Sequence, residues 1–142
     1  MFVLPLAGAR NERPEVVSMI QLIANPDKYH GKTVGINGYL RNVFEHSSIY
    51  YTKELSDRRS TKDALWVRYH KDCKMNPHTE DGLEYFDKKW VLLVGQFRKD
   101  EFGHMGANSG AIVNVTIIST NGPPTRRQGH RQDVTTRLST PA

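Results

Sequence analysis

The chain has 142 residues, of which 37% are hydrophobic and 25% are charged. This composition fits one compact domain and leaves little room for two. No apolar run approaches the ~18 residues needed to cross a bilayer, so the sequence predicts no membrane span. A single cysteine, Cys73, excludes an internal disulfide framework.

The formal charge of +5 is concentrated at one end of the chain. Residues 119–142 carry a net charge of +3, from four arginines and one aspartate, whereas residues 1–118 carry a net charge of +2. The terminal segment is rich in Pro, Gly and Thr and poor in large apolar residues, which predicts a disordered basic tail over 119–142. Nucleic-acid binding needs a basic surface, and composition supports it mainly through this tail.

The opposite end begins with the apolar residues MFVLPLAGA. They lack the leading positive charge of a secretory signal, so we expect residues 1–13 to form a flexible segment. The compartment stays open at this point. Cytoplasmic localisation is slightly favoured, and export is expected if the true start lies upstream.

The first half of the body predicts one helix and three strands. Apolar residues at helical spacing predict a helix over 14–24, which ends there because Pro26 disfavours helical geometry at the preceding residue. Alternation of apolar and polar residues predicts strands over 34–40, 48–51 and 65–69. The almost entirely polar stretch over 52–63 predicts a solvated loop.

The second half predicts a short helix and two more strands. Residues 70–89 show no strand pattern and suit a loop followed by a short helix. Residues 90–97 are apolar on both faces, as in a strand that is covered on both sides. A glycine-bearing loop over 98–110 leads to the last predicted strand, 112–118. Gly38 and Gly95 within strong strands predict a tightly coiled sheet.

This order of elements looks like an OB-fold, the five-stranded, partly open barrel. A closer resemblance is carried by IANPDKYHGKTV (23–34), GYL (38–40), ALWV (64–67), VGQF (94–97) and GHMG (103–106). With these segments the chain resembles, over about residues 16–118, a family of small bacterial OB-fold-like proteins. The resemblance implies a mainly β, five-stranded OB-like barrel over 14–118, with an N-terminal helix and a short helix between strands 3 and 4. It implies no catalytic residues.

Ligands of OB-folds usually lie across strands two and three, between the loops that join strands one and two and strands four and five. Here these positions interleave aromatic and basic side chains, a pattern that suits base stacking at ~1–3 kcal/mol per base. The candidate ligand-binding residues are Tyr39, Arg41, Phe44, His46, Tyr50, Trp66, Arg68, Phe102 and His104. The alternative is that these rings pack against the N-terminal helix.

Two further motifs are less specific. The GHMG loop has the G-x-x-G pattern of the KH domain, but it joins two strands, so glycines with positive φ are the better interpretation. His70, Cys73 and His78 are suitable zinc ligands, yet their spacing matches no zinc motif, and we expect no metal site. No serine elbow, phosphate-binding loop or close carboxylate pair supports catalysis.

These patterns predict a non-enzymatic binding module without a cofactor. The first predicted partner is a single-stranded nucleic acid or oligonucleotide, held by aromatic stacking with help from the basic tail. The alternative partner is another protein, bound by the same face or by an edge strand, with a role in the cell envelope. The nearly neutral body favours this alternative.

Overall fold

The computed structural model describes residues 13–43 and 46–120, and this part of the chain is mainly β. Its strands are β1 Glu15–Val16, β2 Thr33–Val43, β3 His46–Tyr50, β4 Ala64–Asn76, β5 Lys89–Arg98 and β6 Ala111–Ser119. Its helices are α1 Met19–Ala24, α2 Pro26–Tyr29 and α3 Lys53–Asp57, with short 3-10 helices η1 Thr61–Asp63, η2 Gly82–Phe86 and η3 His104–Gly106. Phe44 and nearly all of both predicted terminal segments lie outside the described residues.

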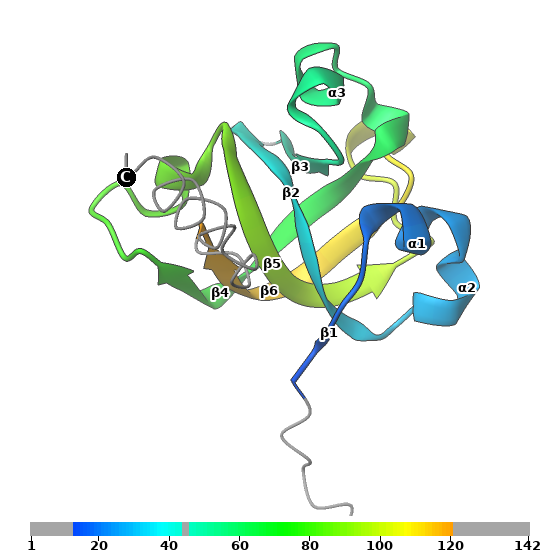
Figure 1. Ribbon diagram of the computed structural model, residues 1–142, viewed down its shortest axis with the longest axis horizontal. Coiled ribbons are helices and arrows are strands. Elements are labelled where there is room, and N and C mark those ends of the chain that lie inside the picture. Colours follow the sequence, from blue (N-terminus) through cyan, green and yellow to red (C-terminus); the bar gives the residue numbers. More distant parts are fainter. Residues whose placement is uncertain (1–12, 44–45, 121–142) are drawn as a thin grey trace, which may run out of the picture.

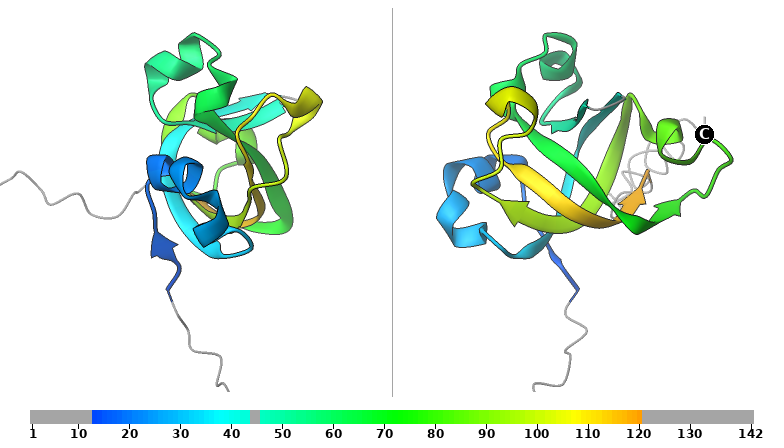
Figure 2. Two further views of the ribbon diagram at one scale, coloured as in Figure 1. Left: turned by 90° about the vertical axis from the view of Figure 1, so that its right-hand side faces the viewer. Right: turned by 180° about the vertical axis from the view of Figure 1, so that it is seen from behind.

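The strands form one sheet that closes into a ring (Figure 1). Their order is β1-β2-β3-β4-β6-β5, and β5 also pairs with β2, from Thr33↔Gln96 to Leu40↔Lys89. Neighbouring strands are antiparallel, except that β1 runs parallel to β2 and β4 parallel to β6. Figure 2 shows the strands curving around a shared interior. In the described part of the chain, the second edge of β1 has no strand beside it.

The core fills the interior of this ring. Along β2, Val34, Ile36 and Leu40 are buried inside, because alternate residues of a strand point to the same face. Burial of each such aliphatic side chain contributes about 1.5–3 kcal/mol relative to exposure. The largest side chains of the core also come from the other strands, from α1 and from η2: Met19, Leu22, Ile49, Leu65, Phe86, Leu93, Phe97, Ile112 and Ile118.

The N-terminal helix is shorter than predicted. Residues 15–16 pair with β2, and α1 begins only at Met19. Ser18 sets this start, because its Oγ accepts a hydrogen bond from the Gln21 backbone N–H at 3.1 Å. The Gln21 side chain in turn accepts from the Ser18 N–H at 3.0 Å, which completes a capping box. The predicted end at Ala24 is confirmed.

The prediction of a solvated loop over 52–63 is wrong. The Thr52 hydroxyl accepts from the Leu55 N–H at 3.2 Å and starts α3, which packs against β2 and β3. Lys53 and Asp57 form an ion pair of 2.9 Å one turn apart. The only buried residue of this helix is the polar Ser56, so the segment has no apolar stripe from which a helix could have been predicted.

The prediction that residues 70–89 contain no strand is also wrong in its first part. β4 continues to Asn76, and its last residues pair with β6, for example Met75 with Ile118. The register shifts between Tyr69 and Lys74, which breaks the alternation that sequence patterns rely on. The short helix predicted in the rest of this segment is confirmed as η2.

Candidate ligand-binding face

One face of β2, β3 and β4 carries most of the predicted site residues, and we call it the β2–β4 face. Tyr39 and Arg41 lie on it because they alternate with the core residues of β2. Cross-strand pairs extend it over the neighbouring strands: Tyr39 with Tyr50, Arg41 with Ser48, Val43 with His46, and Ser48 with Trp66. Arg68, two residues beyond Trp66, shares the face. The alternation therefore predicted this grouping correctly.

The two tyrosines of this face are buried. Tyr39 is 6% exposed and Tyr50 is 4% exposed. The Tyr39 ring meets the ring of Trp90 edge-on, with centroids 5.9 Å apart. Burial raises the pKa of Tyr50, although the guanidinium groups of Arg41 and Arg59 oppose that shift. Both rings thus act mainly in packing, with Tyr39 against Trp90 of β5. The alternative, that these rings pack against the N-terminal helix, stays a prediction.

Trp66 is partly covered by the loop over 98–110. Gly103 has a φ of 70°, and a Cβ at this position would lie 2.5 Å from Cε3 of the indole. Only glycine allows this approach in this backbone conformation, as the sequence predicted for the GHMG loop. The Asn108 amide donates to the buried Ser48 hydroxyl at 3.1 Å and ties the loop to β3.

Two imidazoles lie near Trp66, Arg68 follows it on the same face of β4, and Phe102 precedes Gly103 in the loop. The ring of His46 lies edge-on to Trp66 with centroids 5.3 Å apart, and His104 lies 6.5 Å from His46. Phe102 is about half exposed on the same loop. Arg68 forms an ion pair of 3.6 Å with Glu101. The loop therefore brings the predicted residues of β3, β4 and the 98–110 segment into one cluster.

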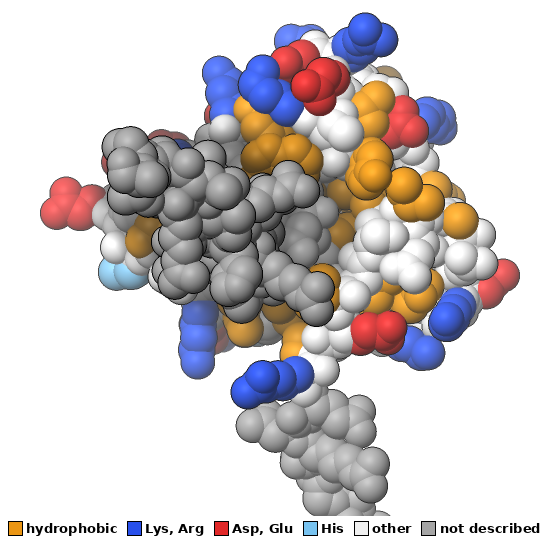
Figure 3. All heavy atoms as spheres, in the orientation of Figure 1, with side chains coloured by type: hydrophobic (Ala, Val, Ile, Leu, Met, Phe, Trp, Pro, Cys, Tyr) orange, Lys and Arg blue, Asp and Glu red, His pale blue; other side chains and the backbone are white. Residues whose placement is uncertain are grey.

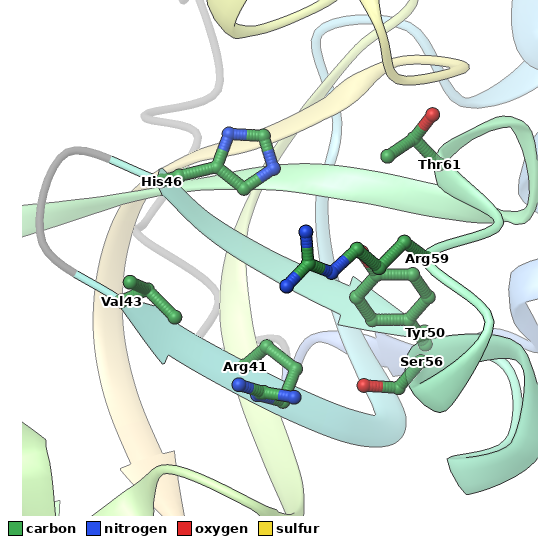
Figure 4. Close-up of a pocket in the computed structure, with 7 residues that line it drawn as sticks. All are labelled: Arg41, Val43, His46, Tyr50, Ser56, Arg59 and Thr61. Carbon is green, nitrogen blue, oxygen red and sulfur yellow. The ribbon is translucent and has the colours of Figure 1, made fainter.

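A cavity of ≈ 290 Å³ adjoins this cluster on the side of α3. Figure 4 shows Arg41, Arg59 and His46 gathered over β2 and β3, with Ser56 and Thr61 on the side of α3. The lining residues are Arg41, Val43, His46, Tyr50, Ser56, Arg59 and Thr61. Sequence analysis missed Ser56, Arg59 and Thr61, because they lie in the polar stretch that was predicted to be a loop.

Two polar atoms of this cavity are buried without a hydrogen-bond partner among the described residues. They are the Ser56 Oγ and the Arg41 Nε. The nearest acid of Arg41 is Asp87, whose Oδ1 lies 3.5 Å from Nε and also accepts the Asn42 N–H at 2.8 Å. Asp87 offsets the charge of Arg41, whereas the Ser56 Oγ has neither a hydrogen bond nor an ion pair within the described chain, which costs about 1–3 kcal/mol. The cavity is therefore equipped to donate hydrogen bonds.

A groove of ≈ 480 Å³ lies on the opposite side of Tyr39. Asn37 of β2 lines the groove, whereas Arg41 of the same strand face lines the cavity. Four apolar side chains near the groove are about half exposed: Val16, Ile20, Tyr51 and Trp90. Figure 3 shows hydrophobic side chains between the positions of α3 and α1. The same face of β2 therefore borders the apolar groove at Asn37 and the basic cavity at Arg41.

The weak metal candidates do not come together. His70 Nδ1 accepts the Asp72 N–H at 3.0 Å, and burial raises the pKa of the Cys73 thiol, which packs against the core. Residues 13–43 and 46–120 contain no group of three His, Cys, Asp or Glu side chains that could hold an ion. Within the same ranges, no helix is both long and apolar enough to cross a membrane.

Comparisons with known proteins add little to this geometry. No family model matches the chain, and neither does any curated protein. One similar solved structure is the crystal structure of a protein assigned as an aspartyl-tRNA synthetase from Leishmania major Friedlin, with a TM-score of 0.42 and 12% identity. The match covers 80% of this chain and 22% of that protein, so the chain spans about a fifth of its length. A likeness at this level carries no argument about fold or function.

Proposed function

We propose that the chain is an OB-like barrel that binds a single-stranded nucleic acid or oligonucleotide without catalysing a reaction. The strand ring supports the barrel, because β2 to β6 follow the expected order of three strands, a short helical insert and two strands. The parallel pairing of β4 with β6 beside the β2–β5 closure agrees with it. The ligand lies across β3 and β4, under the 98–110 loop.

The observation that carries this proposal is the meeting of guanidinium groups and accessible rings on the β2–β4 face. Arg41, Arg59 and Arg68 supply positive charge for phosphates. The rings of His46, Trp66 and His104 form a chain of contacts beside them. Sequence-tolerant binding of single strands combines these two elements, a basic path and stacking rings. Tyr39 and Tyr50 are buried and support this face by packing.

Tryptophan fluorescence tests the proposal, because Trp66 lies on the proposed face and Trp90 lies beside the apolar groove. The Trp90→Phe variant keeps Trp66 as the sole tryptophan, and Trp66→Phe keeps Trp90. Titration with short single-stranded DNA and RNA should quench the first variant and leave the second unchanged. Three neutralised phosphates predict a slope of about −2 for log K against log salt. Salt-insensitive binding, or quenching of Trp90 alone, would contradict the proposal.

A protein partner is the second candidate, and the apolar groove favours it. β1 pairs with β2 on one side only in the described chain, so an extended peptide could add beside it. Apolar side chains of that peptide would cover Val16 and Trp90. Extended peptides with alternating apolar residues should then shift the emission of Trp90 to the blue in the Trp66→Phe variant. An unchanged spectrum at millimolar peptide would exclude this partner.

A further inference from the structure

We propose that the cavity between α3, β2 and β3 binds a phosphate monoester, namely the terminal phosphate of the strand held on the β2–β4 face. This inference rests on the function proposed above and specifies the group that the strand presents. The cavity is lined by two arginines, two hydroxyl-bearing residues, a tyrosine ring and an imidazole. The donors, the charge and the shape of the cavity each support this inference.

A buried hydroxyl of the cavity lacks a hydrogen-bond acceptor in the part of the chain that the structure describes. Ser56 is 2% exposed, and its Oγ has no hydrogen-bond partner among the described residues. Within the same residues, Arg41 Nε is also buried without a hydrogen bond, although Asp87 Oδ1 forms an ion pair with it at 3.5 Å. Figure 4 shows the side chains of Ser56 and Arg41 near the ring of Tyr50. A phosphate offers several unesterified oxygens and could accept from the Ser56 hydroxyl, which would remove the cost of burying it unpaired, and from the guanidinium of Arg41.

The positive charge of the cavity also favours a phosphate. Arg41 and Arg59 both line the cavity, and the charge of each opposes the rise that burial causes in the pKa of Tyr50. Asp87 faces Arg41 at 3.5 Å, but its Oδ1 is shared with the Asn42 N–H. Arg59 forms no ion pair with any residue in 13–43 or 46–120. The cavity therefore keeps uncompensated positive charge, which an anion would neutralise.

The backbone of Arg59 has an unusual conformation. Its φ is 54°, in the left-handed region that non-glycine residues rarely occupy. Hydrogen bonds hold it there, since its N–H donates to the Ser56 carbonyl at 3.0 Å and its carbonyl accepts from Thr61 at 2.9 Å. Glycine would adopt this conformation without strain. A charged residue at a strained position beside a cavity points to use of the side chain.

The size and shape of the cavity favour a terminal phosphate. The cavity of ≈ 290 Å³ lies at the small end of the range of ligand pockets, so it fits one group and not several nucleotides. Ser56 and Tyr50 are almost fully buried and close its inner side. An internal phosphodiester needs an exit on both sides, whereas a monoester needs one. His46 belongs to both the cavity and the ring cluster, so the first base would stack where the cavity opens.

The test measures how the full chain binds matched oligonucleotides with a 5′-phosphate, a 3′-phosphate or neither. We expect one phosphorylated form to bind at least tenfold more tightly than the unphosphorylated strand. Arg59→Gly should abolish this preference, and it should also weaken binding of the unphosphorylated strand, because Arg59 contributes charge to the β2–β4 face. Arg58→Gly is the matched control, because Arg58 carries the same charge next in sequence and does not line the cavity. Ser56→Ala should weaken the preference without loss of stability.

Each outcome decides between the two proposals. Equal binding of all three oligonucleotides would overturn the terminal-phosphate site and leave the nucleic-acid face standing. If no oligonucleotide binds, the proposed function fails, and thermal shifts with a nucleoside monophosphate and inorganic phosphate decide the cavity. Stabilisation of the wild type but not of Arg59→Gly by the nucleotide would then assign the site to free phosphate monoesters. No stabilisation by either probe would overturn the inference.

Discussion

Gly103 lies against the indole of Trp66 so closely that a Cβ would stand 2.5 Å from the ring. Gly103→Ala should therefore displace the 98–110 loop and destabilise the protein by about 2–4 kcal/mol, from overpacking added to a left-handed backbone. Gly106→Ala is the control, because Gly106 also has a positive φ but no neighbour within 4 Å of its Cβ position. Chemical denaturation should show the larger loss for Gly103→Ala; equal losses would refute the contact.

The Arg59 backbone predicts an unusual effect on stability. Arg59→Gly should leave the free energy of unfolding unchanged or raise it by about 1 kcal/mol, because glycine relieves the left-handed strain. Arg59→Ala removes the same guanidinium but keeps the strain, and should be less stable than Arg59→Gly. Thermal denaturation of the two variants measures the difference. The reverse order would show that glycine relieves no strain at the left-handed position of Arg59.

The hydrogen bond from Asn108 to Ser48 should couple the loop to β3. Both residues are buried, and the donor–acceptor distance is 3.1 Å. Asn108→Ala should cost about 1–3 kcal/mol, since it removes this bond inside the protein. A double-mutant cycle with Ser48→Ala should give a coupling energy of about 1 kcal/mol. Additive effects of the two substitutions would show that the bond does not hold the loop.

The ion pair between Asp27 and Lys99 predicts a dependence of stability on pH. The hydrogen bond and charge of Lys99 lower the pKa of Asp27 below its ordinary value. Because this pKa is depressed in the folded protein, the contribution is present above the ordinary pKa and is lost as the pH falls through the folded value. Asp27→Asn should therefore differ from the wild type at neutral pH and converge with it in acid.

Salt provides the control for this pair. Both side chains are well exposed, so added salt should screen their attraction and reduce the difference between Asp27→Asn and the wild type at neutral pH. The measurement is the midpoint of thermal unfolding in low and high salt. A difference that persists in acid and in high salt would assign the effect to the structure around α2 instead of to charge.

The strands could be predicted because their residues alternate between a buried and an outer face. The same alternation placed Arg41, Trp66 and Arg68 on one face, and the strand pairing agrees. It could not predict which rings stay accessible, because Tyr50 is buried only once α3 packs against β3. That these residues bind a ligand stays a prediction.

The cavity could not be predicted for a different reason. Ser56 and Thr61 lie in a stretch without apolar periodicity, where α3 is started by a hydroxyl cap and buries a polar residue. The direction of Arg59 depends on its own left-handed backbone, which hydrogen bonds with Ser56 and Thr61 hold and which an arginine in the sequence does not signal. α1 was predicted too long because two residues sufficed to add β1 to the sheet. Register shifts hid the end of β4 in the same way.

The position of Tyr39 on β2 has a consequence for how the two hollows work together. Asn37 lines the apolar groove and Arg41 lines the basic cavity, and four residues of a strand span about 13 Å. Tyr39 fills this interval as a buried side chain on a strand that pairs with β5 from Thr33 to Leu40. Ligands in the groove and in the cavity would therefore be held at a constant distance from each other, which β2 sets.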